Sequence, residues 1–441
     1  MTDSPKSDDV YTRQQRIATL AKQSRERAIL SLNQYLDLHW LETAYARTRK
    51  DGALGVDGQT SAEYAKDLES NLRSLLDRAK SGSYYAPPVR RTYISKGPGS
   101  KETRPLGIPT FEDKVLQRAI VMLLQPIYEE DFLPCSYGFR PGRSAHQALR
   151  ALREGLMQYQ GGWILDVDIR KFFDTLQRPA LRELLRRRIR DGVVLRLIDK
   201  WLNAGVWEKG TITHPDEGTP QGGVISPLLA NIYLHYVLDE WFEQEVKPRL
   251  QGRAFLIRFA DDFVVVFTHE VDARRVLEVL PRRFAKFGLT LHPTKTRLVP
   301  FRNPNHWEVR KGRTPEPDTF DLLGFTHYWA RSRKGCWVVK RKTSQIRLRR
   351  AILAVTEWCR GHFHRPVIEQ HHTLCQKLRG HAAYYGITGN HCALSAFRHF
   401  VTQIWREWLS RRKRGQPMSW TLFRRLLERY PLPTPAVLND V

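Results

Sequence analysis

Two adjacent carboxylates, Asp261 and Asp262, interrupt a largely apolar stretch that reads Ile-Arg-Phe-Ala-Asp-Asp-Phe-Val-Val-Val-Phe over residues 257–267. The apolar residues on both sides predict two strands joined by a tight turn. Burying one unpaired carboxylate costs several kcal/mol, and a second one beside it adds like-charge repulsion. The pair therefore lies either on a solvated turn, where Asp is a favoured residue, or at a place where cations bind.

The charge balance restricts the partners of such a chain. The sequence has 72 Lys and Arg against 46 Asp and Glu, a net charge of +26 at pH 7. A protein this basic carries a positive field over much of its surface, and phosphate backbones are the expected partner. No apolar run approaches the roughly 20 residues of a membrane-spanning helix, and the first residues lack the apolar stretch of a signal peptide. We therefore expect a nucleic acid as partner, and no membrane.

The five cysteines are scattered without a C-x-x-C pair, which favours a reducing compartment over a disulfide framework. Residue types that bind zinc gather in one stretch, at Cys359, His362, His364, His371, His372 and Cys375. Pro366 interrupts this stretch, and no paired ligand spacing emerges. We interpret the cluster as the polar faces of two helices that meet near Pro366, with a zinc site as the less favoured alternative.

The expected elements run from helices through a mixed middle region to helices again. In chain order they are helical patterns at 11–50 and 61–80, strands near 86–96 and 104–109, a helix at 111–129, a strand at 163–169, a very basic helix at about 178–203, a glycine-rich loop at 218–223, helices at 226–243 and 272–287, a strand at 320–325 and a hairpin near 328–342. The remainder is expected to be helical and basic.

Three carboxylates stand near the ends of expected strands. Asp168 ends one β-like segment, while Asp261 and Asp262 lie between two others. If these strands are neighbours, the three carboxylates meet at one end of a sheet. Two hard cations about 3.5–4 Å apart, held by carboxylates, stabilise the attacking and leaving oxygens in many phosphoryl-transfer enzymes. The middle region has no Walker loop, H-E-x-x-H helix or G-x-S-x-G elbow. Two-metal chemistry on a nucleic acid is predicted, with a plain hairpin turn as the alternative.

Eight short segments follow one another in a characteristic order. The first four are Gly52-Ala-Leu-Gly-Val-Asp-Gly, Tyr93-Ile-Ser-Lys-Gly-Pro-Gly-Ser-Lys-Glu-Thr-Arg-Pro-Leu-Gly-Ile-Pro, Ser136-Tyr-Gly-Phe-Arg-Pro-Gly-Arg-Ser-Ala-His and Asp168-Ile-Arg-Lys-Phe-Phe-Asp. The last four are Gly218-Thr-Pro-Gln-Gly-Gly-Val-Ile-Ser-Pro, Phe259-Ala-Asp-Asp, Gly288-Leu-Thr-Leu-His-Pro-Thr-Lys-Thr and Leu322-Leu-Gly-Phe. In this order they resemble the motifs of the reverse transcriptases encoded by bacterial and organellar group II introns. The resemblance covers about residues 50–410.

This resemblance implies an α+β fold, a right-hand polymerase with fingers and palm, followed by an all-helical thumb or maturase domain. We expect an N-terminal helical extension at 1–80, a reverse transcriptase domain of fingers and palm at 81–335, a thumb or maturase X domain at 336–415 and a C-terminal tail at 416–441. Within the X domain, Leu378-Arg-Gly-His-Ala-Ala-Tyr-Tyr-Gly is similar to the family's maturase segment, which binds intron RNA.

The resemblance also implies the roles of the carboxylates. Asp168, Asp261 and Asp262 would be catalytic ligands of two Mg²⁺ ions, with Mn²⁺ as an alternative, and the backbone carbonyl of Ile169 would assist. Asp166, on the same strand face as Asp168, is the rival for the first ligand.

Asp168 is preferred because the family's aromatic gate falls five residues later, at Phe173. A ring there would exclude the 2′-hydroxyl of a ribonucleotide, and simple core packing is the alternative for Phe172 and Phe173.

Further contacts follow from the same motifs. The residues implied to bind the nucleotide or to lie near the metals are Lys96, Arg104, Gln221 and Lys295; those implied to contact primer or RNA are Gly324, Phe325, Arg379, Tyr384 and Tyr385. A solvated hairpin tip is the alternative for Lys96 and Arg104. The core of a helical bundle is the alternative for the two tyrosines.

Two departures from the family pattern stand out. Phe259 replaces the usual tyrosine before Ala-Asp-Asp, which should leave metal binding intact but alter a nucleotide or primer contact. Many family members continue into a DNA-binding segment and an HNH endonuclease, and we expect neither here, since no paired cysteines follow the maturase-like helices.

The implied reaction is RNA-directed DNA polymerisation, in which a primer 3′-hydroxyl attacks the α-phosphate of a dNTP. The implied partners are an RNA template, intron RNA, a DNA primer or target and dNTPs, in the bacterial cytoplasm and at the nucleoid when bound to DNA. The leading hypothesis is a mobile-element enzyme that splices its intron RNA and copies it at a new site. A free-standing relative in phage defence or DNA repair is the second. A non-catalytic RNA-binding maturase is the third, and the intact carboxylates disfavour it because they repel RNA.

Overall fold

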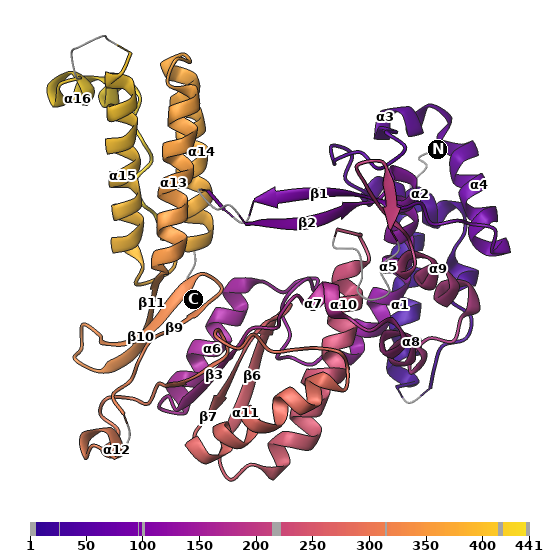
Figure 1. The fold of residues 1–441 in the computed structure, drawn as a ribbon, viewed down its shortest axis with the longest axis horizontal. Helices are drawn as coiled ribbons and strands as arrows, with labels where there is room; N and C mark the ends of the chain where they lie inside the picture. Colours follow the sequence, from indigo (N-terminus) through magenta and orange to yellow (C-terminus); the bar gives the residue numbers. More distant parts are fainter. Residues whose placement is uncertain are drawn as a thin grey trace.

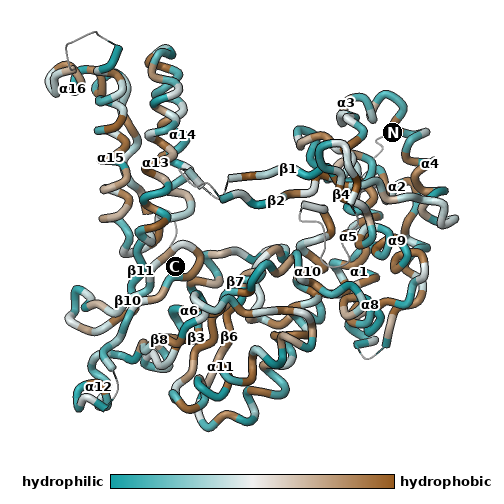
Figure 2. Tube along the Cα trace, viewed as in Figure 1, coloured by the Kyte–Doolittle hydropathy of each residue, from teal (hydrophilic) through white to brown (hydrophobic). Residues whose placement is uncertain are grey.

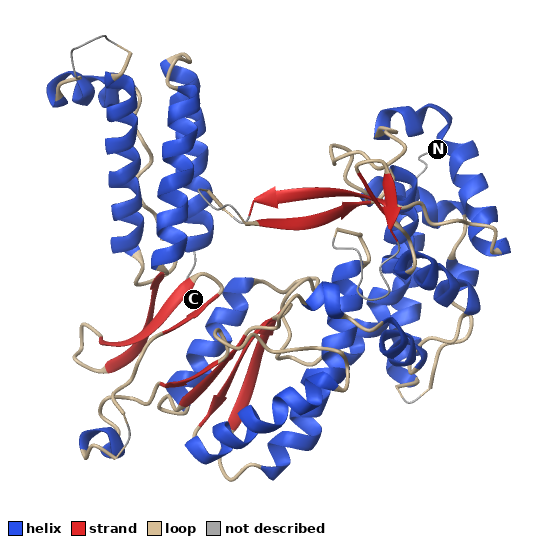
Figure 3. Ribbon diagram, viewed as in Figure 1, coloured by secondary structure: helices blue, strands red, loops and turns tan. Residues whose placement is uncertain are grey.

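The computed structural model describes residues 6–25, 27–95, 97–98, 102–213, 222–313, 315–412 and 418–437. Figure 1 shows N-terminal helices, a central sheet and a group of C-terminal helices, with a long hairpin that reaches from the first region toward the last. Strands lie in the hairpin, in the centre and at the base of the C-terminal helices (Figure 3). This mixture of helices and sheets confirms the expected α+β class.

The N-terminal helices pack around one largely buried helix, α5 (Phe111–Asp131). The others are α1 (Lys6–Gln23), α2 (Leu38–Arg47), α3 (Ser61–Tyr64) and α4 (Leu68–Ser81), with short 3₁₀ turns η1 (Asn33–Tyr35) and η2 (Ala65–Asp67). Trp40 of α2 is fully buried and donates to the carbonyl of Ala119 on α5 at 3.0 Å. The helical pattern expected over 11–50 is interrupted, because Asp37 caps α2 by accepting from the Trp40 amide.

The expected hairpin is present as β1 (Val89–Ser95) and β2 (Thr103–Ile108). Two further strands, which the sequence pattern does not predict, extend this sheet: β4 (Val206–Glu208) and β5 (Thr211–Thr213), in the order β2-β1-β4-β5. β4 pairs with β1 in parallel. The hairpin is thereby joined to the chain that leads into the glycine-rich loop.

The central sheet has the order β6-β7-β3-β8 with antiparallel neighbours. Its strands are β3 (Trp163–Val167), β6 (Ala254–Phe259), β7 (Asp262–Phe267) and β8 (Arg297–Pro300). Alternate residues of β7 serve two cores: Val264 and Val266 pack in the cluster of α6 (Ala145–Gln158), and Phe263 and Val265 in that of α11 (Glu270–Ala285). Figure 2 shows the apolar character of these strands.

The basic helix expected over about 178–203 is two helices, α8 (Arg178–Arg186) and α9 (Gly192–Leu202). The break occurs because Asp191 caps α9, accepting from the amides of Val193 and Val194 at 2.9 and 3.0 Å. Helix α10 (Ser226–Leu234) continues through the π-helical turns η3 (His235–Asp239) and η4 (Phe242–Val246) and the 3₁₀ turn η5 (Lys247–Arg249). The short helices α7 (Phe172–Thr175) and α12 (Trp307–Arg310) complete the middle region.

A second sheet, in the order β11-β10-β9, connects the centre to the C-terminal helices. Its strands are β9 (Phe320–Leu322), β10 (Phe325–Arg331) and β11 (Trp337–Thr343), followed by α13 (Gln345–His362), α14 (Val367–Tyr385), α15 (His391–Ser410) and α16 (Trp420–Arg429). These helices bury their own core, with Leu374, Val401 and Trp405 fully covered. Pro366 is the N-cap of α14, so two helices meet there as the sequence predicted. Across the described ranges, no helix is long and apolar enough to cross a membrane.

Candidate active site

The turn between β6 and β7 carries the adjacent carboxylates. Phe259 pairs with Asp262, which leaves Ala260 and Asp261 as the turn, and Ala260 has a left-handed φ of +57°. On the other side of β7, Phe263 pairs with Val167 of β3. Continuing this register by one residue sets Asp168 opposite Asp262. The strands are thus neighbours, and the three carboxylates meet at one end of the sheet.

These carboxylates lie in a cleft of about 730 Å³ between the central sheet and the β1–β2 hairpin. The lining includes Asp168, Asp261, Asp262, Lys295, Arg104, Arg170, Lys171, Phe139, Phe172, Phe173, Gly222 and Gly223. The cleft therefore combines carboxylates with cationic and aromatic side chains. That combination suits a ligand that has both phosphates and planar rings, with metal ions between its phosphates and the carboxylates.

The electrostatics of the cleft disfavour three free carboxylates. Desolvation raises the pKa of Asp262 to about 6, and repulsion from Asp261, Asp168 and Asp166 adds to the rise, although the side chain stays open to the cleft. The pKa of Asp261 is also raised by desolvation, while Arg104 opposes the rise. A divalent cation would relieve this repulsion, because it favours the charged form of each carboxylate.

Two cations separate the rival aspartates. Lys295 Nζ lies 2.9 Å from Asp168 Oδ2, whereas Arg297 Nε lies 3.2 Å from Asp166 Oδ2. Asp168 lines the cleft, and Asp166 does not. Asp166 instead pairs across the sheet with Arg297 of β8. This geometry favours Asp168 over Asp166 as a residue that meets a ligand in the cleft.

After Asp168, the backbone carbonyl of Ile169 points away from residues 290–292, the segment with which this part of the chain pairs. The Asp168 carbonyl accepts from the His292 amide and the Arg170 amide donates to the Thr290 carbonyl, both at 2.8 Å. Because ladder bonds alternate, the peptide groups of Ile169 point to the opposite side, toward β7. The Ile169 carbonyl is thus on the side from which Asp262 approaches.

The donor set fits a hard cation in its chemistry, since it consists of carboxylate oxygens and a carbonyl. Within the described part of the chain, however, no group of three or more His, Cys, Asp or Glu side chains is arranged to hold a metal ion by itself. Asp168 is engaged by Lys295, and the neighbouring carboxylates repel one another. A metal here would need oxygen ligands from a bound phosphate as well.

The sequence predicts a nucleotide-selecting ring at Phe173, with core packing as the alternative for Phe172 and Phe173, and the structure places the two rings differently. Phe172 is buried in the core, and Phe173 is half-buried and packs edge-on against it with ring centroids 5.2 Å apart. Both contribute to the cleft lining. Arg104 is exposed on the cleft wall. The two other residues expected to bind nucleotide, Lys96 and Gln221, lie outside the described residues.

The predicted primer-contacting turn joins β9 to β10. Leu323 and Gly324 both have left-handed φ values, +51° and +81°. The Tyr384 hydroxyl donates to the Leu323 carbonyl at 2.8 Å, and a Cβ on Gly324 would lie 2.9 Å from the Tyr385 hydroxyl oxygen. Phe325 packs against both tyrosine rings. These contacts support the packing interpretation of the tyrosines, and their contact with RNA stays a prediction.

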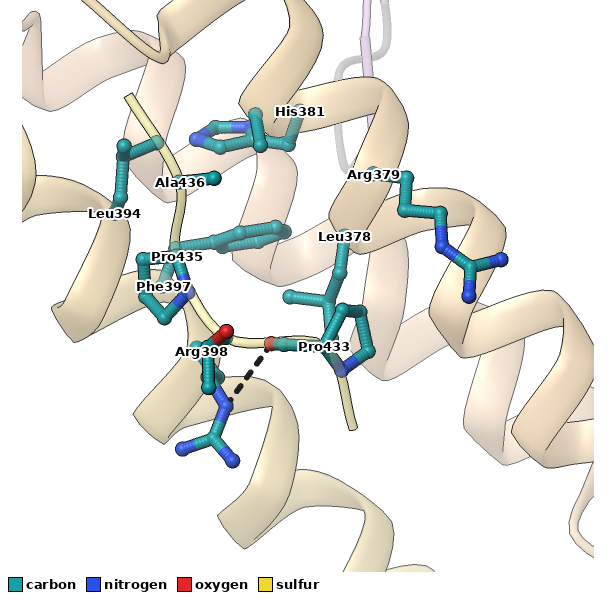
Figure 4. Close-up of a pocket in the computed structure, with 11 residues that line it drawn as sticks. Leu378, Arg379, His381, Leu394, Phe397, Arg398, Pro433, Pro435 and Ala436 are labelled. Atoms are coloured by element: carbon teal, nitrogen blue, oxygen red, sulfur yellow. Dashed lines mark hydrogen bonds between the residues drawn. The ribbon is translucent and has the colours of Figure 1, made fainter. Parts of the chain in front are cut away.

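Arg379 lies apart from that turn. It belongs to the lining of an apolar pocket of about 250 Å³ between α14, α15 and residues 433–436. Figure 4 shows its side chain pointing away from the pocket, while His381 and Phe397 point into it. The structure therefore does not bring Arg379 together with the carboxylates.

One group beneath the Asp turn was not anticipated. Arg258 is completely buried and forms a bidentate ion pair with the equally buried Asp239, at 2.7 and 2.5 Å. Its remaining donors reach Asn231 Oδ1 at 2.9 Å, Ser136 Oγ at 2.8 Å and the Ala260 carbonyl at 3.1 Å. Arg258 thereby fixes the carbonyl that precedes Asp261. The one sign of this group in the sequence was a lone arginine inside an apolar strand.

Comparison with known proteins gives the chain its relatives. Protein YkfC of Escherichia coli (strain K12) is 38% identical over 242 residues, 48% of this chain and 62% of that protein. Group II intron-encoded protein LtrA of Lactococcus lactis subsp. cremoris is 44% identical over 168 residues, 38% of this chain and 27% of that protein. Nuclear intron maturase 2, mitochondrial, of Arabidopsis thaliana is 29% identical over 177 residues, 31% of this chain and 24% of that protein.

The match to each of these relatives spans less than two thirds of the relative's own length. The protein family described as reverse transcriptase (RNA-dependent DNA polymerase) matches residues 94–327, more than half of the chain. This range includes β2 and the end of β1, the glycine-rich loop and all three carboxylates. The chain therefore belongs to the reverse transcriptase (RNA-dependent DNA polymerase) family, and over part of its length it is similar to a group II intron-encoded protein.

Proposed function

We propose that the protein is an RNA-directed DNA polymerase with a right-hand arrangement. Residues 81–335 would form fingers and palm, 336–415 the thumb or maturase X domain, 1–80 a helical extension and 416–441 a tail. The observation that carries this proposal is the meeting of Asp168, Asp261 and Asp262 in one cleft beside Arg104 and Lys295. The α13–α15 helices across the hairpin from the N-terminal region support the assignment of a thumb (Figure 1).

The cleft residues would then have distinct roles. Asp168, Asp261, Asp262 and the Ile169 carbonyl would hold two Mg²⁺ ions, or Mn²⁺ in their place. When bound, such ions supply Lewis-acid stabilisation of the attacking and leaving oxygens. The primer 3′-hydroxyl gives up its proton to water and its oxygen forms a bond to the α-phosphorus of the dNTP, while the bond from the α-phosphorus to the bridging oxygen breaks and pyrophosphate leaves.

The other predicted residues bind and select the nucleotide. Arg104 would pair with the triphosphate, together with Lys96, and Gln221 would lie under the nucleotide. Phe173 would exclude ribonucleotides by its ring. Lys295 balances the charge of Asp168 before the nucleotide arrives, given their 2.9 Å ion pair.

Primer extension on an RNA template tests the proposal. The purified protein with Mg²⁺ should extend a DNA primer, and Asp168→Asn, Asp261→Asn or Asp262→Asn should each abolish extension. Asp166→Asn is the matched control, because Asp166 pairs with Arg297 outside the cleft, and it should retain activity. No extension by the wild-type protein, or full extension by the Asp261 and Asp262 variants, would refute the polymerase assignment.

A maturase role is the second candidate function, with retromobility as its consequence. The specific observation is the contact of α14 with the β9–β10 turn, which links the C-terminal helices to the proposed primer end through Tyr384 and Leu323. Relatives named as an intron-encoded protein and an intron maturase favour the same role. Splicing of the intron RNA that surrounds the gene, with and without the protein, is the test. If the flanking DNA encodes no such ribozyme, the free-standing role in phage defence or DNA repair replaces it.

A further inference from the structure

Phe139 occupies a position that packing does not explain. The residue is 62% exposed, although it is large and apolar, and it belongs to the lining of the carboxylate cleft. Its backbone is left-handed, with a φ of +56°. That region is unfavourable for a bulky residue, so the surrounding structure must impose it.

The neighbours of Phe139 impose this conformation from below. The Gly138 carbonyl accepts from Asn231 Nδ2 at 2.7 Å, and Asn231 is itself held by Arg258. A Cβ on Gly138 would lie 2.4 Å from the Ala260 amide nitrogen, so only glycine permits this close approach.

On the other side of Phe139, Arg140 is nearly buried. It pairs with Glu129 at 3.0 Å and donates to the carbonyls of Leu133 and Ser136, each at 2.9 Å. Both flanks are therefore fixed in the interior, and Phe139 is the residue presented to the cleft.

We propose that Phe139 is a stacking platform for a nucleobase bound in the cleft, which rests on the proposed polymerase function. An exposed ring costs free energy in water unless a ligand covers it. The same cleft presents Arg104, Arg170, Lys171 and Lys295, so its ligand carries negative charge as well as an apolar face. Nucleotides combine a phosphate with a planar base, and aromatic side chains stack on any of the bases.

The location ties this platform to the reacting end of the nucleic acid. Residues 136–138 run beside the Asp turn, with the Tyr137 amide donating to the Arg258 carbonyl at 2.9 Å and Gly138 against Ala260. Ring and carboxylates are therefore fixed to one rigid unit. A base on Phe139 would be held at a set distance from Asp261 and Asp262, whether it belongs to the template, the primer terminus or the incoming nucleotide.

Fluorescence of 2-aminopurine tests the proposal with the full-length protein. The probe is placed in three separate arms: at the templating position, at the terminus of a 3′-deoxy primer, or in the incoming deoxynucleotide. Stacking quenches its emission. Phe139→Gly removes the ring and suits the left-handed backbone, so the fold should be kept. In the arm whose base stacks on the ring, quenching should be lost and binding should weaken by about 5- to 150-fold, as base–aromatic stacks are worth.

Further variants separate stacking from general packing. Phe139→Tyr should restore quenching, while Phe139→Leu should not, because it keeps apolar volume without a planar face. Phe400→Ala removes an exposed phenylalanine of α15 outside the cleft lining, and it should bind and quench as wild type. If Phe139→Gly quenches and binds like the wild type in all three arms, the stacking inference is overturned. Primer extension by the wild-type protein would in that case still support the polymerase proposal. Failure of the wild type to extend would instead overturn the polymerase proposal.

Discussion

Replacing Arg258 by methionine should destabilise the protein by about 3–5 kcal/mol, the usual loss when one partner of a buried ion pair is removed. Methionine is close to arginine in length but leaves the fully buried Asp239 without its two donors. Asn231 Oδ1, Ser136 Oγ and the Ala260 carbonyl also lose a donor each. These losses share one site and are not additive, so the upper limit stays near 5 kcal/mol.

Urea unfolding followed by tryptophan fluorescence measures this loss, and two further variants sharpen it. Arg258→Met combined with Asp239→Leu removes both charges and should recover most of the stability, because a buried ion pair replaced by apolar residues is often neutral. Arg73→Met removes an exposed arginine paired with Glu69 and should change stability by less than about 1 kcal/mol. Primer extension by the double variant should still fall, since the Ala260 carbonyl is no longer held. A loss below about 1 kcal/mol for Arg258→Met would refute the reasoning.

Three further outcomes are expected. Desolvation and like charges raise the pKa of Asp262 from 3.8 to about 6, so the folded state binds the proton more tightly than the unfolded state does, and the stability from this group is lost as pH rises from about 4 through 6. At pH 8 without divalent cations, Asp262→Asn should therefore have a higher Tm than the wild type. Added Mg²⁺ should raise the Tm of the wild type more than that of the variant. Gly138→Ala should destabilise by about 1–3 kcal/mol through its clash with Ala260, whereas Gly380→Ala, in open space on α14, should stabilise by up to about 1 kcal/mol, both measured by urea unfolding. Phe173→Ala should increase ribonucleotide incorporation relative to deoxynucleotide incorporation in primer extension, and an unchanged ratio would contradict its role as a gate.

Local patterns predicted the central elements because those elements are defined by short-range signals. The apolar residues on both sides of Asp261 and Asp262 were enough to predict the β6–β7 hairpin, and alternation of apolar and polar residues predicted the strand just before Asp168. The prediction of one continuous basic helix over 178–203 was wrong, because the carboxylate of Asp191 caps a new helix and outweighs the helical pattern around it. The β4 and β5 strands have three residues each, too few for a periodic signal, and only pairing with β1 defines them.

The charged residues of the site could be predicted from the sequence, but the buried side chains that hold them in place could not. Residue spacing brings Asp168 opposite Asp262 once the strands pair, but nothing in a sequence states which distant side chains lie underneath. Arg258 illustrates the difference, because a cation in an apolar strand was compatible with an exposed face or with a buried partner, and its partner Asp239 is 19 residues away in a π-helical turn.

A buried cation directly behind three carboxylates has an electrostatic consequence as well as a structural one. Arg258 opposes the rise in the pKa of Asp261, although desolvation remains the larger effect. The ion pair with Asp239 cancels most of its charge at a distance, so Arg258 does not replace the cations that the cleft favours. Its hydrogen bond to the Ala260 carbonyl instead holds the turn in a left-handed conformation that repulsion between the carboxylates would otherwise relax. The protein thus keeps the carboxylates together by rigid backbone support. Lys295 pairs with Asp168, and the charge that remains on the other two carboxylates is left for a ligand to compensate.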